Sequence, residues 1–311
     1  MDEAPTVKSK IELQSKFPSH TPPIPDLRDD NILVKTKHIN YLAPPEVLIE
    51  FKYADIIQEI GNDVTKSFQK GDRICGFVHG SNGVQPEDGA FAEYIVEAGT
   101  LRLGVTIAGQ GLYQGLKLPL PTNPIKEAQR ILIYRGSTAT STLATQLAKR
   151  SGYKVLTICS PCNLDQVKWF GADAIFDYRD PGSNRIKEIT SDSLRLVFDT
   201  ISSEDSARYC DRAISSGGDY SALLPLAIER PKDVSHGATI AYTAFGEGFQ
   251  FGPRAIPPRS EDYKLLAEKK LSVYPPKVCP VGLNGILEGL VFMREGKVSG
   301  EKLVYDIEDT S

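Results

Sequence analysis

The chain has 311 residues, of which 41% are hydrophobic and 24% charged, and its formal net charge is −4. This length can form one large or two ordinary domains with a sizeable core. The sequence has no basic block of the kind that binds nucleic acid, and no apolar run approaches the roughly 18–20 residues that span a bilayer. Residues 1–10 are acidic and polar without an apolar signal core, so we expect a cytoplasmic protein. The five cysteines are few and odd in number, which argues against a disulfide framework.

The first third of the chain predicts short strands separated by turns. Residues 1–30 are polar and rich in proline, and they are expected to form loops. Strands are then predicted within 32–37, 53–60, 70–80 and 89–99, with a Gly-Asn turn after the second. Short strands bounded by glycine are typical of a small β-rich domain.

The pattern changes after a proline-rich connector at 117–124. Apolar strands alternate with helical stretches from there on, and repeated β-α units imply a parallel sheet that is covered by helices on both faces. The predicted strands are 131–134, 154–158, 172–178, 194–201, 237–245 and 302–307, and the predicted helices include 163–171, 203–214, 283–296 and one that ends near Arg150. The fold class is therefore α/β, with a doubly wound sheet after a β-rich part.

The segment 131–142 has the order strand, glycine turn, helix, which suits a nucleotide phosphate. We expect Gly136 to adopt backbone angles that are closed to other residues. The free N–H groups and partial positive charge of a helix N-terminus attract an anion. The spacing departs from G-x-G-x-x-G, because Arg135 stands in the first glycine place and Ser141 in the last. The alternative is a helix with Ser137 as its N-cap, in a fold that binds nothing there.

The end of the second strand of the parallel sheet indicates the cofactor. An NAD site has an Asp or Glu at this place for the ribose 2′-hydroxyl, and this sequence has none. Ser160 and Asn163 can instead donate hydrogen bonds to a 2′-phosphate, and Tyr178 offers a further hydroxyl, with Arg179 and Lys168 close in sequence. This pattern favours NADPH over NADH. The alternative, that Ser160 and Asn163 cap the next helix, is compatible with the same role.

Cys159 and Cys162 form a C-x-x-C pair in the same loop. Such a pair can be a redox site or half of a zinc site. The chain has no second C-x-x-C, and its four histidines lie far away in sequence. We therefore expect no metal, and we expect the pair to line the cofactor loop.

Several motifs together resemble the fungal trans-acting enoyl reductases. These proteins belong to the zinc-independent medium-chain dehydrogenase/reductase superfamily and act with highly reducing polyketide synthases whose own enoyl reductase domain is inactive. The resemblance extends over nearly the whole chain from about residue 26. The motifs that carry it are KGDRICGFVHG, GAFAEYIV, GQGLYQGLKLPLP, ILIYRGSTATSTLATQLAKRSGYKVLTICSPCN, FGADAIFDYRDP and GEKLVYDIE.

The resemblance implies a fold and a reaction. The fold would be a GroES-like catalytic domain at 1–116, an NADPH-binding Rossmann domain at 117–278, and a return to the catalytic domain at 279–311. Hydride would pass from NADPH to the β-carbon of an α,β-unsaturated polyketide thioester on an acyl carrier protein, and a proton would then reach the α-carbon. Donors aimed at the thioester oxygen would stabilise the enolate. The resemblance also implies a monomer, and 237–245 is the candidate edge strand through which more distant relatives dimerise.

The resemblance also implies site residues. Phe245, Gly246 and Glu247 match a segment near the nicotinamide and substrate. Lys37 and Thr106 are the catalytic candidates, with a solvated surface lysine and a helix N-cap as the alternatives. The implied cofactor-binding residues are Gly136, Ser137, Thr138, Ala139, Thr140, Ser141, Thr142, Ser160, Pro161, Cys162, Asn163, Tyr178, Leu223, Leu224, Val298 and Ser299.

The sequence departs from the family pattern mainly in its first third. A segment is missing just before residue 38, so Lys37 matches the family lysine only through the motif that follows it. Another segment is missing before residue 104, and Asp55 replaces a glycine at a place where we expect the backbone to be tight. Two further hypotheses stay open: a truncated or diverged relative that binds NADPH without reducing a substrate, and a free-standing quinone or enone reductase.

Overall fold

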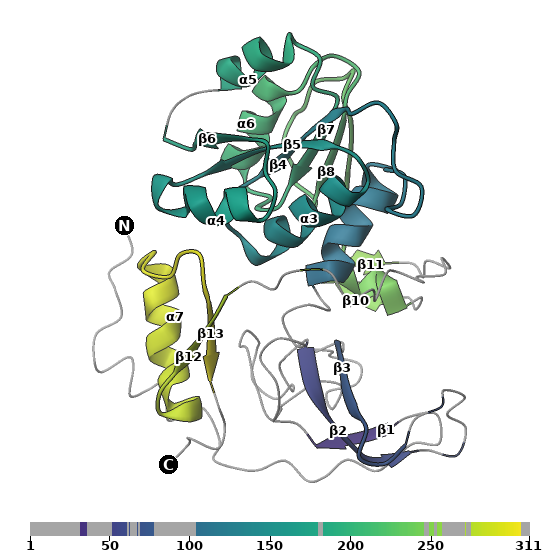
Figure 1. Cartoon of the computed structure of the whole chain (residues 1–311), viewed down its shortest axis with the longest axis vertical. Coiled ribbons are helices and arrows are strands. Elements are labelled where there is room, and N and C mark those ends of the chain that lie inside the picture. The colour runs from purple at the N-terminus through teal and green to yellow at the C-terminus, as the bar shows by residue number, and fades with distance from the viewer. Residues whose placement is uncertain are drawn as a thin grey trace.

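The computed structural model describes residues 32–35, 52–60, 62, 67, 69–77, 104–179, 183–245, 249–251, 254–256, 271 and 275–305. Its largest part is a six-stranded sheet with the strand order β6-β5-β4-β7-β8-β9, in which every neighbouring pair is parallel (Figure 1). This is the strand order of a doubly wound dinucleotide-binding sheet. The strands are β4 (Arg130–Tyr134), β5 (Lys154–Cys159), β6 (Ala174–Asp177), β7 (Leu196–Asp199), β8 (Asp219–Ala222) and β9 (Ser235–Ala238).

Helices cover both faces of this sheet, as the sequence predicts. Figure 1 shows α3 and α4 on one face and α5 and α6 on the other. A short 3₁₀ turn, η3 (Pro161–Asn163), leads from β5 into α4. The helices are α3 (Ala139–Arg150), α4 (Leu164–Trp169), α5 (Ser183–Thr190) and α6 (Glu204–Ala213).

The apolar run of β4 serves the cores on both faces. Ile131 and Ile133 belong to a cluster with Leu147 of α3, whereas Leu132 belongs to a second cluster with Ala207 of α6. Successive side chains of a strand point to opposite faces, and all three β4 residues are fully buried. A strand that is buried on both sides reads as a continuous hydrophobic run, which is why the sequence identifies it.

The helix at 104–109 continues into a wider π-helical turn, η2 (Gln110–Gly115). Glycines bring this turn close to the sheet. A Cβ on Gly111 would lie 2.3 Å from the ring of Phe198, and a Cβ on Gly115 would lie 2.4 Å from Oγ of Ser221. The turn therefore packs directly on β7 and β8, while the domain boundaries at 116 and 278 stay predictions.

Three strands of the first part form an antiparallel sheet in the order β1-β2-β3. They are β1 (Ile32–Lys35), β2 (Lys52–Ile60) and β3 (Arg73–Phe77). Asp55 pairs with Ile74 in the regular register of β2 and β3, while the expected tight backbone at this residue stays a prediction. The strand that is predicted at 89–99 lies outside the described residues.

The region after β8 differs from the prediction. A strand was expected over 237–245, but β9 ends at Ala238 and a 3₁₀ turn, η4 (Ala241–Phe245), follows. Oγ1 of Thr243 donates to the carbonyl of Ile240 at 2.8 Å, a local bond that competes with strand pairing. A short hairpin, β10 (Phe249–Phe251) and β11 (Arg254–Ile256), comes next.

The C-terminal segment forms a small unit beside the nucleotide sheet (Figure 1). Its strands β12 (Pro276–Cys279) and β13 (Lys302–Tyr305) are parallel, and the 3₁₀ turn η5 (Gly282–Gly285) and helix α7 (Ile286–Arg294) connect them. The predicted helix at 283–296 is thus confirmed over 286–294, with a 3₁₀ turn before it, and the predicted strand at 302–307 is confirmed over 302–305.

Candidate functional site

The candidate site lies at the carboxyl ends of the parallel strands. From β4 the chain continues to β5 and β6 on one side of β4, whereas β7, β8 and β9 lie on its other side. In open α/β sheets, ligands bind in the crevice outside the strand ends at such a switch point. The residues that follow β4, β5, β6 and β8 include most of the predicted cofactor-binding residues.

The turn after β4 differs from its prediction. Arg135, not Gly136, adopts the left-handed conformation, with φ of 64°. Gly136 is required for another reason: a Cβ there would lie 2.4 Å from Oγ1 of Thr157 and 2.9 Å from Cγ1 of Val167. The glycine therefore allows the turn to pack against β5 and α4, and the expected backbone freedom at this residue is wrong.

The start of α3 is held by a reciprocal pair of hydrogen bonds. The N-cap is Thr138, one residue after the predicted Ser137. The Ser141 N–H donates to Oγ1 of Thr138 at 3.1 Å, and the Thr138 N–H donates to Oγ of Ser141 at 3.0 Å. The Ser141 hydroxyl also lies 2.7 Å from the carbonyl oxygen of Arg135, which it can reach as a donor. The serine that replaces the last glycine thus ties the turn together, and the first-turn N–H groups of Ala139 and Thr140 remain for an anion.

The tips of β4 and β7 are joined across the switch point. Oγ1 of Thr200 donates to the Tyr134 carbonyl at 2.6 Å and lies 3.3 Å from Oγ1 of Thr138. These contacts therefore fix the position of the start of α3 relative to the end of β7.

The loop after β5 is bound to the C-terminal segment. Nδ2 of Asn163 donates to Oγ of Ser160 at 3.2 Å and to Oγ of Ser299 at 2.9 Å. Nε2 of Gln166 donates to the carbonyl of Gly300 at 2.6 Å. Ser160 and Asn163 hold the N-cap positions of η3 and α4, as the capping alternative expects, but neither side chain makes a capping hydrogen bond. The structure instead brings the predicted residues Ser160, Asn163 and Ser299 together from distant parts of the sequence.

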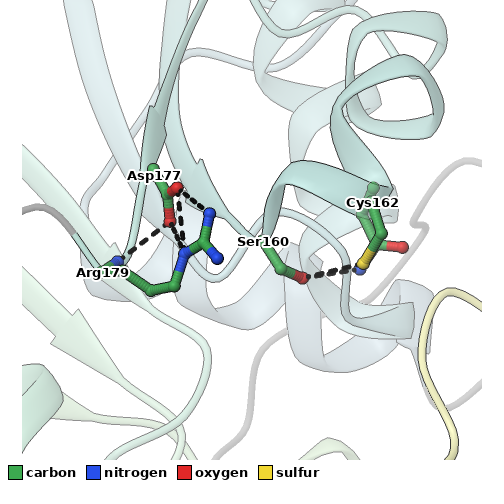
Figure 2. Close-up of polar contacts among 5 residues, drawn as sticks. Ser160, Cys162, Asp177 and Arg179 are labelled. Atoms are coloured by element: carbon green, nitrogen blue, oxygen red, sulfur yellow. Dashed lines mark hydrogen bonds and ion pairs between the residues drawn. The ribbon is translucent and has the colours of Figure 1, made fainter.

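A carboxylate does stand near this loop, at the end of the neighbouring strand. Asp177 pairs with Cys159 in the register of β5 and β6. Nε and Nη2 of Arg179 donate to its two carboxylate oxygens at 2.6–3.1 Å, and the Arg179 N–H donates at 3.0 Å (Figure 2). These hydrogen bonds lower the pKa of Asp177 and raise the pKa of Arg179 from their ordinary values. Arg179, expected as a cation for the phosphate, is thus engaged by Asp177.

Tyr178 and Arg135 meet at the same edge. The Tyr178 N–H donates to the carbonyl of Cys159 at 3.2 Å, and the Gly136 N–H donates to the carbonyl of Ile158 at 2.9 Å. Tyr178 is 45% exposed, and Cζ of Arg135 lies 5.4 Å from its ring centroid. In the glycine pattern Arg135 is only a departure, although it also brings a positive charge to this edge of the sheet.

A buried carboxylate organises the loop after β7. Asp199 is fully buried, and its Oδ1 accepts from the N–H groups of Ile201 and Ser202, each at 3.0 Å. Its Oδ2 accepts from the hydroxyls of Ser206 at 2.6 Å and Tyr220 at 2.7 Å. The sequence signal for this network is an aspartate at the last position of a buried strand.

Through this network the loop after β8 is held in place. Oγ of Ser202 accepts from the N–H groups of Leu223 at 2.8 Å and Leu224 at 3.2 Å. Leu223 is half-buried and Leu224 exposed. Ser202 and Asp199 were not predicted as site residues, although they position two leucines that were.

The catalytic candidates are only partly described. Thr106 is half-buried and lies inside a helix that already includes 104 and 105, so its N-cap alternative is wrong. Nε2 of the buried Gln110 donates to Oγ1 of Thr243 at 3.0 Å, which ties this helix to η4. Lys37, Gly246 and Glu247 lie outside the described residues, and of Phe245 only the backbone is described.

The two cysteines of the cofactor loop differ in environment. Cys159 is buried, and this burial, with smaller contributions from Cys162 and Asp177, raises the pKa of its thiol to about 11. Cys162 is exposed and its Sγ lies 3.5 Å from Oγ of Ser160 (Figure 2). Among the described residues, no group of three or more His, Cys, Asp or Glu side chains is arranged to hold a metal ion. In that same part of the chain, no helix is long and apolar enough to cross a membrane.

Comparisons with known proteins identify the family. No family model matches the chain. The trans-enoyl reductase TOXD of Cochliobolus carbonum is 50% identical over 254 residues, which cover 73% of this chain and 85% of that protein. The trans-enoyl reductase resD of Aspergillus sclerotiorum is 38% identical, over 93% of this chain and 96% of that protein. The chain belongs to the fungal trans-enoyl reductases. Since the resD alignment has 344 positions and the chain only 311 residues, part of that trans-enoyl reductase has no counterpart here.

Solved structures confirm the fold class of this trans-enoyl reductase family member. The JamJ enoyl reductase has a TM-score of 0.60 at 19% identity, over 83% of this chain and 78% of that one. The quinone oxidoreductase from Coxiella burnetii has a TM-score of 0.65 at 19% identity, over 91% and 92%. A mycobacterial protein in complex with NADPH has a TM-score of 0.56 at 18% identity, over 72% and 77%. The predicted α/β fold class, with a β-rich part and a doubly wound nucleotide-binding sheet, is confirmed.

Proposed function

We propose that this chain is an NADPH-dependent trans-acting enoyl reductase. Its substrate would be an α,β-unsaturated polyketide thioester on the acyl carrier protein of a partner highly reducing polyketide synthase. The observation that carries the proposal is the convergence of the ends of β4, β5 and β6 around phosphate-binding groups, in a chain of the trans-enoyl reductase family.

The groups at this edge suit the phosphates of NADPH. The start of α3 offers the N–H groups of Ala139 and Thr140 to the pyrophosphate. The hydroxyls of Ser160 and Tyr178 are available for the 2′-phosphate. Asp177, which would repel that phosphate, is neutralised by Arg179. A site for NADH would keep a free carboxylate here for the ribose 2′-hydroxyl.

The remaining predicted residues frame the rest of the cofactor. Leu223 and Leu224, which Ser202 holds at the end of β8, are proposed to lie beside it. Val298 and Ser299 are proposed to close the adenosine side through the Asn163 contact. The Asn163–Ser299 hydrogen bond would orient the loop after β5, so that Ser160 presents a fixed donor.

Bound NADPH supplies a hydride to the β-carbon of the enoyl thioester. The chain's own part is to position the thioester, to stabilise negative charge on its oxygen and to deliver a proton to the α-carbon. Lys37 and Thr106 remain the proposed residues for these steps. Thr106 stands on the helix that Gln110 ties to η4, whose last residue is the proposed substrate residue Phe245. The other two proposed substrate residues, Gly246 and Glu247, follow η4 in the sequence.

The proposal is tested by incubating the purified full chain with NADPH and a short enoyl thioester on an acyl carrier protein. We expect the saturated thioester, detected by mass spectrometry. Gly136→Ala should abolish NADPH binding, because its Cβ would lie 2.4 Å from Oγ1 of Thr157. Gly237→Ala is the matched control, since a Cβ there meets nothing within 4 Å. Equal reduction of a free quinone would favour the free-standing reductase.

A second candidate function is a relative that binds NADPH without reducing a substrate. The observation in its favour is that the resD alignment has 344 positions and this chain only 311 residues, so part of resD has no counterpart here. Saturable NADPH binding with no saturated thioester, in the presence of the acyl carrier protein, would establish this candidate and overturn the first.

A further inference from the structure

We propose that Arg135 is the residue that selects NADPH, by binding the 2′-phosphate of its adenosine. The inference rests on the proposed function, because it assigns a role within the same cofactor site. It adds a residue that lies outside the glycine pattern by which such turns are recognised.

The backbone of Arg135 is the first observation. Its φ of 64° lies in the left-handed region, which glycine adopts freely and a residue with a Cβ does not. An arginine at such a place is disfavoured compared with glycine. Residues in this conformation gather at ligand sites, where the side chain has a role that outweighs the strain.

The position of the side chain is the second observation. The turn is bound to the end of β5 through the Gly136 N–H, and Tyr178 is bound to the same strand end through its own N–H. The guanidinium of Arg135 lies over the Tyr178 ring, with Cζ 5.4 Å from the centroid. Ser160 follows directly on that strand end, so Arg135 stands beside the residues that are proposed for the 2′-phosphate.

The charges around the site are the third observation. Arg179 has its guanidinium on the carboxylate of Asp177. Lys168 lies in the last turn of α4, at the end of that helix away from Ser160. Arg135 forms no ion pair with any carboxylate of the described residues, and its ordered contact there is the ring of Tyr178. Among the described residues, its charge is therefore the one at this edge that a ligand can use.

The chemistry of the guanidinium fits a phosphate monoester. Arginine presents a planar fork of N–H donors that binds phosphate through two hydrogen bonds, and it stacks on aromatic rings at the same time. Tyr178 would thus hold the guanidinium flat while its edge faces the phosphate. NADH lacks the 2′-phosphate, so this contact distinguishes the two cofactors.

The test compares the dissociation constants of NADPH and NADH in Arg135→Asn with those in the wild type, from cofactor fluorescence in the full chain. Asparagine tolerates the left-handed conformation and removes the charge. We expect the NADPH constant to rise about tenfold and the NADH constant to stay within about twofold. Lys154→Asn, an exposed cation at the opposite end of β5, is the matched control and should change neither. Displacement of NADPH by 2′-AMP should weaken in Arg135→Asn, and displacement by 5′-AMP should not.

Two further results separate this inference from the proposed function. If the wild type prefers NADPH and Arg135→Asn keeps the full preference, or weakens both cofactors equally, the role of Arg135 is overturned and the proposed function stands. If the wild type binds neither cofactor, both are overturned. Arg135→Gly restores the residue that the backbone favours, so an unchanged or raised melting temperature together with a lost NADPH preference would support the inference without any fault in folding.

Discussion

At the residue scale, the charge that a nucleotide meets beyond β6 depends on one pair of side chains. Asp177 is an acid next to the end of β5, and Arg179 covers it with its guanidinium. Since the pKa of Asp177 is lowered, the pair persists above the ordinary pKa of an aspartate and is lost only as the pH falls through the lowered value. At neutral pH the acid is thus ionised and neutralised by its partner.

Replacing Arg179 should therefore reveal the acid. We expect Arg179→Gln to weaken NADPH binding roughly fivefold and NADH binding much less, because only the 2′-phosphate is repelled. The double variant Asp177→Asn with Arg179→Gln should recover most of the loss. Binding titrations of both cofactors at low salt check this. A loss that persists in the double variant would mean that Arg179 itself contacts the phosphate.

Two neighbouring thiols should differ sharply in reactivity. The pKa of Cys159, about 11, keeps it protonated and unreactive at neutral pH, and it is buried, whereas Cys162 is exposed. We expect iodoacetamide to modify Cys162 and to leave Cys159 intact, with slower labelling of Cys162 when NADPH is bound. Mass spectrometry of the peptide that contains both cysteines measures the two sites separately. Rapid labelling of Cys159 would show that the end of β5 opens to solvent.

At the element scale, the first turn of α3 depends on a serine where the fingerprint has glycine. Ser141 is fully buried and exchanges hydrogen bonds with Thr138 in both directions. We expect Ser141→Ala to lower the free energy of unfolding by about 1 kcal/mol, the usual cost of a lost cap contact. Ser235→Ala, on the exposed edge strand β9, is the control. Equal urea midpoints for the two variants would contradict a stabilising role for this hydrogen-bond pair.

The loop between β7 and α6 depends on one buried carboxylate. Asp199 accepts hydrogen bonds from two backbone N–H groups and two hydroxyls, so Asp199→Ala leaves buried donors without an acceptor. We expect a loss of about 3 kcal/mol in the free energy of unfolding, and a smaller loss in Asp199→Asn, which keeps an acceptor for the N–H groups. Tyr220→Phe removes only one of the donors and should cost about 1 kcal/mol. Urea unfolding of the three variants measures these losses. Three equal free energies of unfolding, close to that of the wild type, would contradict a stabilising role for Asp199.

The sequence predicts elements better than it predicts contacts. The continuous apolar run of β4 and the strands after it predict a sheet that is covered on both faces, and the structure has it. The strand expected at 237–245 fails, since Thr243 bonds to a nearby carbonyl instead of a neighbouring strand. Sequence spacing also cannot reveal that Asn163 meets Ser299, because that contact depends on the folded position of the C-terminal segment.

The turn after β4 shows the same difference at the candidate site. The glycine pattern locates the phosphate turn, but it assigns the backbone freedom to Gly136, whereas Arg135 has the positive φ. In the pattern Arg135 is only a departure from glycine, and its contact with Tyr178 is what suggests the proposed role in binding the 2′-phosphate. Local patterns thus indicate where the cofactor is proposed to bind, and the proposed choice between NADPH and NADH depends on side chains from separate strand ends.

At the scale of the whole molecule, the nucleotide sheet and the shorter first part are proposed to act together in hydride transfer to the enoyl thioester. The nucleotide half is described from β4 to β9, and the family is that of the trans-enoyl reductases. The proposed function requires that Thr106 and Lys37, the proposed catalytic residues, lie around the enoyl thioester. Part of resD has no counterpart in this chain, so this requirement is the one that most needs a test.

The most direct measurement uses NADPH that carries deuterium at its transferable position, with an enoyl thioester on an acyl carrier protein and the full chain. We predict a saturated thioester with one deuterium at the β-carbon, and at cofactor concentrations below saturation we predict less of it from the matched NADH because its affinity is lower. If the chain binds NADPH saturably and still returns the enoyl thioester without deuterium, the proposed hydride transfer is contradicted.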